Sequence, residues 1–344
     1  MTSGVVTKRE LLSQPERWKA LVTRANEQEW LPKLELKNFD DILVFGSGSS
    51  YYLAMLVAEL IETATGIRAR PVPSCEVFLC QERYLNLQGR KGLAIGISRS
   101  GESSEALVAA DLLKANGFSL LVVGCYDSSS MAAKADHRLI VSEGQEEGLV
   151  MLRSFTSMLL GFQLFLAGQK NGDSKFYKLP TVGERLLNTY TKRLTSLAHK
   201  RDFRRFVFLG SGVHFPLTFE AGLKMQEMAI ATSESYHSLE YRHGPKSTAA
   251  SDTLLTLFAL DGDTYGVDLL RDLKEYDVTT LVIGENVQTY QNVADEIVEL
   301  ESGLNQSDRM ILTLLPAQLL AFETSLRLEQ NPDVSRNLSQ VVKF

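Results

Sequence analysis

The stretch DDILVFGSGSSYYLAMLVAELIE, residues 40–62, has the layout of a buried strand, a glycine-rich turn and an apolar helix. Residues 42–45 form a short continuous hydrophobic run, which is typical of a parallel strand covered on both faces. The turn at 46–48 follows at once, and a helix is expected over about 50–63. This order predicts the first strand–helix unit of an α/β fold.

The same alternation continues along the first half of the chain. Further strands are expected in ARPVPS (69–74), GLAIGIS (92–98), FSLLVVGCY (118–126) and HRLIVS (137–142), with helices from about 102 and over about 149–166. Strands that alternate with helices predict a doubly wound parallel sheet with helices on both faces.

The pattern then restarts. FRRFVFLGSGVHFPLTFEAGLKMQE (203–227) repeats the layout of the first unit, with Gly210 at the place of Gly46, an offset of 164 (210 − 46). Later segments repeat in the same order: DTLLTLFALDGD (252–263), VTTLVIGEN (278–286) and DEIVELE (295–301). The chain is therefore expected to hold two copies of one α/β unit.

This repeat predicts five regions. They are an N-terminal helical segment (1–35), a first domain (36–170), a linker with a connecting helix (171–199), a second domain (200–330) and a C-terminal tail (331–344), with a helix over about 307–328 closing the second domain.

The composition excludes several classes of protein. The chain has 344 residues, 44% hydrophobic and 23% charged, which suits about two globular domains. A net charge of −6 argues against a general nucleic-acid or membrane-surface binder, and no run of 18 apolar residues predicts a membrane span. The polar N-terminus and three cysteines without a CxxC pair (Cys75, Cys80 and Cys125) favour reduced thiols in a cytoplasmic protein.

The two copies differ after their second buried strand. The first has SRSGESS (98–104), and the second has LDGDT (260–264). Serine hydroxyls and backbone N–H groups at a helix N-terminus suit an oxyanion, whereas two aspartates there would repel it. We expect phosphate in the first copy only. The alternative is a turn that is merely rich in helix-capping residues.

Two nucleotide motifs are incomplete. The serine turn lacks the lysine of a P-loop, which argues against a nucleoside triphosphate. The run that begins at Gly46 has Tyr51 where a dinucleotide fingerprint has its third glycine, which argues against a dinucleotide.

The segments FEAGLKMQEM (219–228) and SLEYRHGPKS (238–247) carry the other candidate chemistry. Glu220, Lys224 and Glu227 share one face of an otherwise apolar helix, where charges are costly unless they pair or line a polar cavity. His243 follows on a loop, since Gly-Pro ends any helix there. An ordinary surface ion pair and a structural histidine are the alternatives. Together these residues suit acid–base work on an anionic substrate.

Five motifs carry a family resemblance: GSGSSYYLA, ISRSGESSEAL, EEGLVMLRSFT, FEAGLKMQEM and YRHGPKS. With them, residues 36–344 resemble the double sugar-isomerase (SIS) domain family, and within it the isomerase domains of glucosamine-6-phosphate synthases and the stand-alone aminosugar-phosphate deaminases and isomerases. The resemblance implies two tandem doubly wound SIS domains, each a flavodoxin-like three-layer sandwich.

The resemblance also implies roles for individual residues. Glu227 would move a proton between C1 and C2, and His243 would act in ring opening, reaching the site from the other subunit of a homodimer. The remaining residues would contact the sugar phosphate: Ser50, Ser98, Ser100, Ser103 and the Arg99 backbone at the phosphate, and Glu220 and Lys224 at the sugar. No cofactor is implied, and the five histidines and three cysteines show no metal-ligand spacing.

The chain departs from the family pattern at two places. The resemblance places the tail (331–344) over the active site. Its motif NLxK reads NLSQ here, which puts Gln340 where the family has a lysine, and VxSTKxFT reads VMLRSFT (150–156). We expect a cytosolic homodimer that isomerises a hexose or hexosamine 6-phosphate, with deamination when a 2-amino group is present. No glutamine-hydrolysing segment precedes the repeat, so the synthase reaction is not expected. The alternatives are a non-catalytic sugar-phosphate sensor and a deglycase for a glycated amino acid phosphate.

Overall fold

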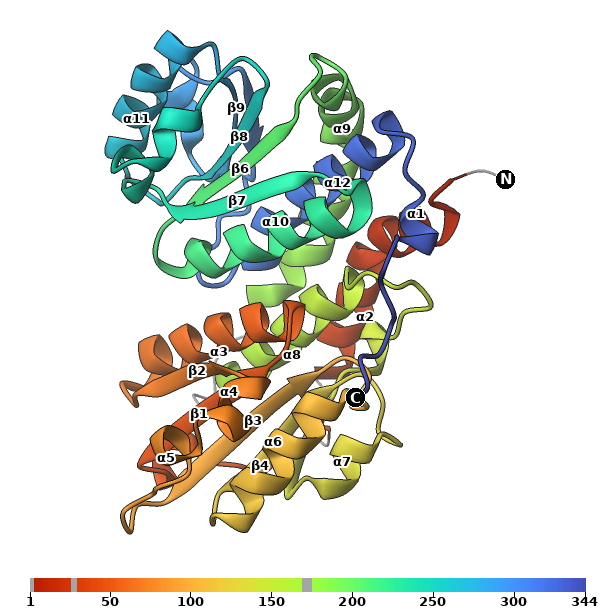
Figure 1. Cartoon of the computed structure of the whole chain (residues 1–344), viewed down its shortest axis with the longest axis vertical. Helices are drawn as coiled ribbons and strands as arrows, with labels where there is room; N and C mark the ends of the chain where they lie inside the picture. The colour runs from red at the N-terminus through yellow and green to blue at the C-terminus, as the bar shows by residue number, and fades with distance from the viewer. Residues whose placement is uncertain (1–2, 26–29, 169–174) are drawn as a thin grey trace. The chain divides into compact units, whose positions relative to one another are not determined.

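The computed structural model describes residues 3–25, 30–168 and 175–344 and divides the chain into two compact units (Figure 1). The first-repeat unit comprises Glu16–Glu147, Met151–Tyr177 and Ser339–Phe344. The second-repeat unit comprises Met1–Pro15, Gly148–Val150 and Lys178–Leu338. The last six residues of the tail therefore belong with the first repeat, although they follow the second in the sequence.

The first-repeat unit is built on one parallel five-stranded sheet in the order β2-β1-β3-β4-β5. Its strands are β1 (Asp41–Gly46), β2 (Ala69–Pro73), β3 (Gly92–Ser98), β4 (Ser119–Gly124) and β5 (His137–Ile140). Both β1 and β3 are buried along their whole length, which is why they read as continuous hydrophobic runs.

Helices pack on this sheet and complete the unit. They are α2 (Gln14–Ala25), α3 (Ser49–Thr65), α4 (Ser74–Leu79), α5 (Gln81–Tyr84), α6 (Ser104–Ala115), α7 (Ser130–Lys134) and α8 (Arg153–Gly168), with 3-10 turns at Leu36–Asn38 and Ser142–Gly144. Leu43, Phe45 and Ala94 on one face of the sheet share a core cluster with Val77 of α4 and with the alanines of α6. Helix α3 contacts β1, β2 and α8.

The second-repeat unit has the same plan. Its parallel sheet has the order β10-β9-β8-β6-β7, formed by β6 (Arg205–Gly210), β7 (Thr232–His237), β8 (Thr253–Phe258), β9 (Thr279–Gly284) and β10 (Glu296–Glu299). Its helices are α1 (Val5–Leu12), α9 (Leu179–Ala198), α10 (Phe215–Ala229), α11 (Tyr265–Leu273) and α12 (Met310–Arg327). Helix α12 contacts both α9 and α10, and α11 joins a separate core cluster.

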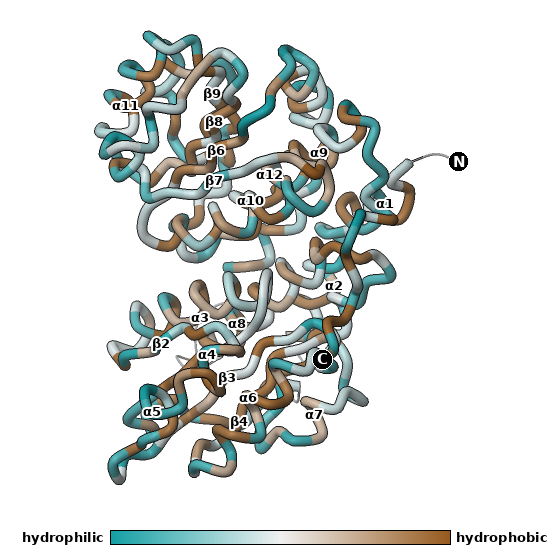
Figure 2. Tube along the Cα trace, in the orientation of Figure 1, coloured by the Kyte–Doolittle hydropathy of each residue, from teal (hydrophilic) through white to brown (hydrophobic). Residues whose placement is uncertain are grey.

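Counted within each repeat, both sheets have the strand order 2-1-3-4-5. The predicted α/β class and the internal repeat are therefore confirmed, while the finer description as a flavodoxin-like sandwich stays a prediction. In this order the chain switches direction between the first and third strands, which is where ligands bind in doubly wound sheets. Figure 2 shows hydrophobic residues along β3 and β4 and hydrophilic ones in the outer loops.

Several element boundaries differ from the prediction. Helix α8 begins at Arg153 rather than near 149, because the Glu146 carboxylate accepts the N–H groups of Leu152 (2.8 Å) and Ser154 (3.0 Å) and so caps the helix there. Strand β7 was not predicted, since its residues are half-buried or exposed and carry no hydrophobic run. Helix α9 begins at Leu179, within the region 171–199 predicted as a linker with a connecting helix, and residues 171–174 of that region lie outside the described residues.

The turns after β1 and β6 impose a steric limit. A Cβ on Gly46 would lie 2.4 Å from the carbonyl oxygen of Ser50, and one on Gly210 would lie 2.7 Å from that of His214. Contacts this short force the backbone of the turn to move. Only glycine lets each strand enter its helix so tightly.

Gly46→Ala is expected to lower the free energy of unfolding of the first-repeat unit by about 1–3 kcal/mol, the usual cost of overpacking. Urea unfolding followed by tryptophan fluorescence measures it. Gly168→Ala at the end of α8 is the control, since its Cβ would meet only a side-chain carbon at 3.5 Å and should change stability by less than about 0.5 kcal/mol. Equal stability of Gly46→Ala and Gly168→Ala would contradict the steric argument.

Candidate functional site

The serine turn joins β3 to α6 in a preformed shape. Gly101 has φ +67°, and the Ser98 hydroxyl accepts the Gly101 N–H at 3.0 Å. The Ser100 hydroxyl accepts the Glu102 N–H at 3.2 Å. Ser98 is buried, whereas Ser100 and Ser103 are half-buried and so can be reached by a ligand. The turn is thus held by its own hydroxyls before any ligand binds.

A second serine turn follows the neighbouring strand β1. Ser50 is buried in the first turn of α3, and the Ser47 hydroxyl donates to the Glu105 carboxylate of α6 at 2.9 Å. This bond ties the turn after β1 to the helix after β3. The predicted phosphate-binding serines therefore meet at the switch point of the first sheet.

The N-terminus of α6 adds electrostatic attraction for an anion. The helix has 12 residues, and within the described chain Ser103 makes no side-chain capping bond to it. Its dipole favours negative charge at this end. The Glu102 carboxylate accepts the N–H (2.7 Å) and hydroxyl (2.8 Å) of Ser130, which lower the pKa of Glu102 and keep it negatively charged.

The Arg99 side chain is directed to other protein groups. Its guanidinium lies 3.3 Å from the Glu146 carboxylate and donates to the Gln340 carbonyl at 3.3 Å. Gln340 in turn donates from Nε2 to the Glu146 carbonyl at 3.4 Å. The predicted tail residue Gln340 therefore lies beside the serine turn, and the Arg99 side chain holds it there.

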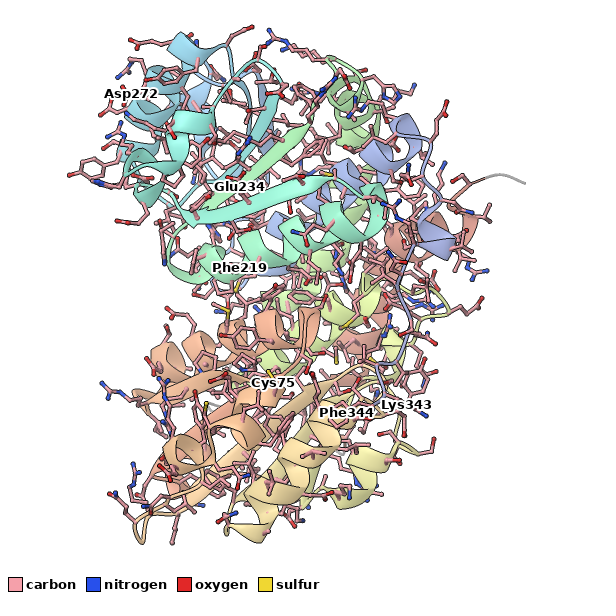
Figure 3. The ribbon with its side chains drawn as sticks, in the orientation of Figure 1. Cys75, Phe219, Glu234, Asp272, Lys343 and Phe344 are labelled. Atoms are coloured by element: carbon pink, nitrogen blue, oxygen red, sulfur yellow. The ribbon has the colours of Figure 1, made fainter. Side chains whose placement is uncertain are left out.

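Two further contacts attach the end of the tail to α6. The Ser104 N–H donates to the Val342 carbonyl at 3.2 Å, and the Phe344 N–H donates to the Ser104 hydroxyl at 3.3 Å. The Phe344 ring lies 6.2 Å from that of Phe78. Figure 3 labels Phe344 and Lys343 at the end of the tail. The tail thus makes backbone bonds at the start of the helix that follows the serine turn.

Sequence reasoning did not single out Glu146. Its fully buried carboxylate accepts bonds from Ser154 Oγ (2.5 Å) and from two backbone N–H groups, besides the ion pair with Arg99. A carboxylate immediately before the long apolar run at 149–166 was the signal available in the sequence.

The second-repeat unit holds the other predicted residues. Lys224 Nζ lies 3.3 Å from Glu220 Oε1 and 2.5 Å from Glu227 Oε2. Glu220 and Lys224 are fully buried, while Glu227 remains 18% exposed. Burial alone would lower the pKa of Lys224, but the two carboxylates outweigh it and raise that pKa. This is a buried charged triad and not an ordinary surface ion pair.

His243 lies on the predicted loop, between single-turn helices at Glu240–Arg242 and Pro245–Thr248. Its side chain is exposed, and Gly244 after it has φ +120°. Within the described residues, no hydrogen bond or ion pair joins the His243 side chain to the triad on α10. The predicted role of His243 in ring opening is therefore not supported by a contact with Glu227 within the second-repeat unit.

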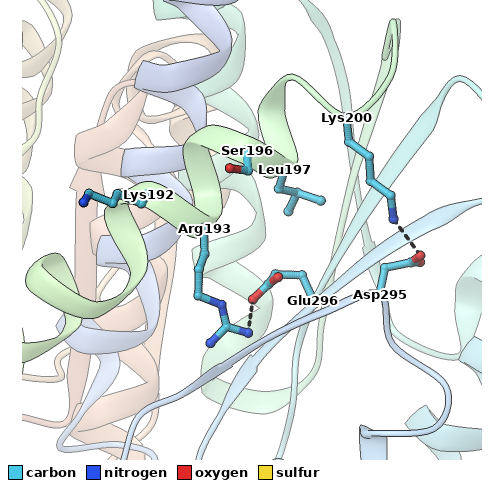
Figure 4. A pocket seen from close by; sticks show the side chains of 7 residues that line it. All are labelled: Lys192, Arg193, Ser196, Leu197, Lys200, Asp295 and Glu296. Atoms are coloured by element: carbon cyan, nitrogen blue, oxygen red, sulfur yellow. Dashed lines mark hydrogen bonds and ion pairs between the residues drawn. The ribbon is translucent and has the colours of Figure 1, made fainter.

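Other features of the described chain bear on ligand classes. A hollow of about 430 Å³ lies between α9 and β10, where Arg193 pairs with Glu296 and Lys200 with Asp295 (Figure 4). None of the predicted site residues lines it. In residues 3–25, 30–168 and 175–344, no group of three or more His, Cys, Asp and Glu side chains could hold a metal ion. None of the described helices is long and apolar enough to cross a membrane.

The first repeat matches a known protein family. Residues 35–168 match the family model described as "SIS domain". The predicted resemblance to SIS proteins is confirmed.

Curated relatives with this resemblance are aminotransferases. The glutamine–fructose-6-phosphate aminotransferases (isomerizing) of Gloeobacter violaceus and Helicobacter pylori are each 28% identical to this chain over 89% of its length. The alignments cover 52% and 53% of those proteins, so the chain spans about half the length of the curated relatives it matches.

Solved structures extend the likeness over both repeats. The glucosamine-6-phosphate deaminase of Thermotoga maritima is 27% identical, with a TM-score of 0.80 over 97% of this chain and 99% of that one. The tagatose-6-phosphate ketose/aldose isomerase of Escherichia coli has a TM-score of 0.85 over 96% of each chain, but at 21% identity it supports the fold alone.

Ser100→Ala combined with Ser103→Ala is expected to weaken binding of a hexose 6-phosphate more than tenfold. Each hydroxyl would contribute a charge-assisted hydrogen bond of roughly 1.5–3 kcal/mol. Isothermal titration calorimetry measures the loss. Asp263→Asn in the second repeat is the matched control and should leave affinity unchanged. If Asp263→Asn weakens binding and the serine variant does not, the phosphate binds in the second repeat and the prediction is wrong.

Proposed function

We propose that this chain binds a hexose or hexosamine 6-phosphate and moves a proton between C1 and C2. The reaction is an aldose–ketose isomerisation, with deamination when C2 carries an amino group. The observation that carries the proposal is the α10 triad, in which one buried lysine is shared by two carboxylates. Lys224 can balance only one negative charge, and Glu227 is the carboxylate that retains exposure. Glu227 is therefore the group available as a base.

The aldose and the ketose are isomers, so the reaction needs neither an oxidant nor a reductant. Glu227 removes the proton from C2 of the open-chain aldose, which leaves an enediolate. The proton of the C2 hydroxyl passes to O1, and Glu227 returns its proton to C1 to give the ketose. His243 moves a proton to the ring oxygen as the ring opens. With a 2-amino sugar, the same transfer gives an imine at C2, and water then releases ammonia and the ketose phosphate.

The other predicted residues have binding roles in this proposal. Ser50, Ser98, Ser100 and Ser103 bind the phosphate with the Arg99 backbone, and Glu220 and Lys224 contact the sugar. Gln340 contributes from the tail. The names of the relatives support this substrate class, since the Thermotoga maritima protein is a glucosamine-6-phosphate deaminase and the curated relatives are isomerizing aminotransferases that use fructose 6-phosphate.

The proposal needs neither a metal nor a cofactor. It includes a cytosolic location, supported by three free cysteines, and a homodimer in which His243 serves the partner's substrate, supported by its exposure on a loop. Metal independence can be checked by assaying the protein in the presence of a chelator.

Glu227→Gln is expected to reduce turnover by about 10²–10⁴, the usual effect of losing a general base, while sugar-phosphate binding persists. The glutamine amide is nearly isosteric with the carboxylate and can still contact Lys224, but the amide cannot accept a proton from carbon. Exchange of solvent deuterium into C1 or C2 of fructose 6-phosphate and glucosamine 6-phosphate, read by NMR, is the direct measurement.

Two outcomes would separate the alternatives. If Glu227→Gln exchanges deuterium at the full rate of the parent, Glu227 is not the base. A parent protein that binds sugar phosphates tightly, yet exchanges deuterium into none of them, is a sensor and not an isomerase.

A mixture of Glu227→Gln and His243→Ala proteins is expected to regain activity after subunit exchange. If the two residues that act on one sugar come from different chains, each mixed dimer carries one intact site. Activity should rise toward about half the parent value per mixed dimer, since one of its sites is then complete. Demonstrated exchange without recovered activity would contradict the shared site.

A further inference from the structure

The turn after β8 in the second repeat corresponds to the serine turn of the first repeat, but it carries an aspartate in place of a serine. Gly262 has φ +74° where Gly101 has φ +67°, and each glycine lies between the third strand of its repeat and the following helix. Asp261 takes the position of Ser100, an offset of 161 (261 − 100). Both repeats therefore place a glycine with positive φ in the turn between the third strand and the following helix.

Arg309 supplies a buried cation at this turn. Both terminal nitrogens of its guanidinium reach the Asp261 carboxylate, with Nη1 to Oδ2 at 3.1 Å, and Nη1 also donates to the Leu304 carbonyl at 2.5 Å. The Arg309 side chain is 1% exposed, and its Nε has no hydrogen-bond partner in the described part of the chain. A buried guanidinium requires an anion, and Asp261 is the anion that the chain provides.

The buried residue beside the pair is uncharged. His214, at the position of Ser50 in the first repeat, is fully buried, and burial together with Arg309 lowers its pKa to about 4. It is therefore neutral at pH 7 and does not compete for Asp261. The fork of an arginine matches the oxygens of a phosphate as well as those of a carboxylate. Asp261 itself is 44% exposed, so solvent reaches the carboxylate side of the pair.

We propose that this turn is an oxyanion site whose resident ligand is the Asp261 side chain. The site would take a phosphate or a phosphate monoester, and the aspartate keeps it closed to both. Each chain then offers one phosphate site, at the serine turn, because the second repeat neutralises its own buried cation. This inference is independent of the reaction proposed above.

The test removes the resident carboxylate and adds inorganic phosphate. Asp261→Ser, which installs the first-repeat residue, is expected to bind about one additional phosphate per chain in calorimetry and to gain thermal stability as phosphate is raised at constant ionic strength. Chloride at the same ionic strength should not reproduce the gain. If Asp261→Ser does not fold, Asp261→Asn, which keeps the side-chain shape, is refolded and titrated in the same way.

Two further variants isolate the cause. Asp263→Asn removes the same charge two residues away, where Oδ1 accepts the Tyr265 N–H at 2.8 Å, and should gain no phosphate site. Arg309→Met added to Asp261→Ser should abolish the new binding. The proposal is overturned if neither Asp261 variant responds to phosphate beyond chloride, or if Asp263→Asn gains the same response.

Discussion

The buried ion pair between Arg99 and Glu146 holds the first-repeat site together. Neither side chain is more than 7% exposed, so each charge has lost most of its water. Such a pair is favourable only when further hydrogen bonds satisfy the remaining polar groups, and Glu146 obtains them from Ser154 and from two backbone N–H groups. Because these donors lie at the start of α8 and Arg99 also bonds the Gln340 carbonyl, the ion pair connects the serine turn, the start of a helix and the tail.

The comparison of the two repeats shows how one backbone can hold different charges. Both repeats have the same strand order and a left-handed glycine in the same turn. In the first repeat the cation beside the turn pairs with Glu146, which leaves the serine hydroxyls and the helix N-terminus for a ligand. In the second, Asp261 enters the turn itself and pairs with Arg309. Under the proposed assignments, the difference between a binding turn and a closed one depends on which residue supplies the counter-charge.

The sequence predicted the buried strands, the repeat and the serine turn at 98–104, because each depends on local pattern. The grouping of Ser50 with that turn came from the family resemblance. Hydrophobic runs identify β1 and β3, and spacing of three and four places Glu220, Lys224 and Glu227 on one helix face. It could not predict β7, a half-exposed edge strand, or the role of Glu146, whose partner Arg99 is 47 residues away. The position of the tail over the site was predicted only from the family resemblance, since contacts between residues some 240 apart leave no local signal.

Gln340 has a consequence for the chemistry that the proposed site can perform. A lysine at this position could add its amine to the carbonyl of an open-chain sugar, whereas a glutamine amide is not nucleophilic and carries no charge. Here the amide instead donates to the Glu146 carbonyl, next to an Arg99 whose positive charge is already balanced. A lysine there would place a second cation beside that buried pair. Proton transfer between adjacent carbons needs a base and not an amine. Under the proposed mechanism Glu227 is that base, so a neutral glutamine in the tail is compatible with the reaction.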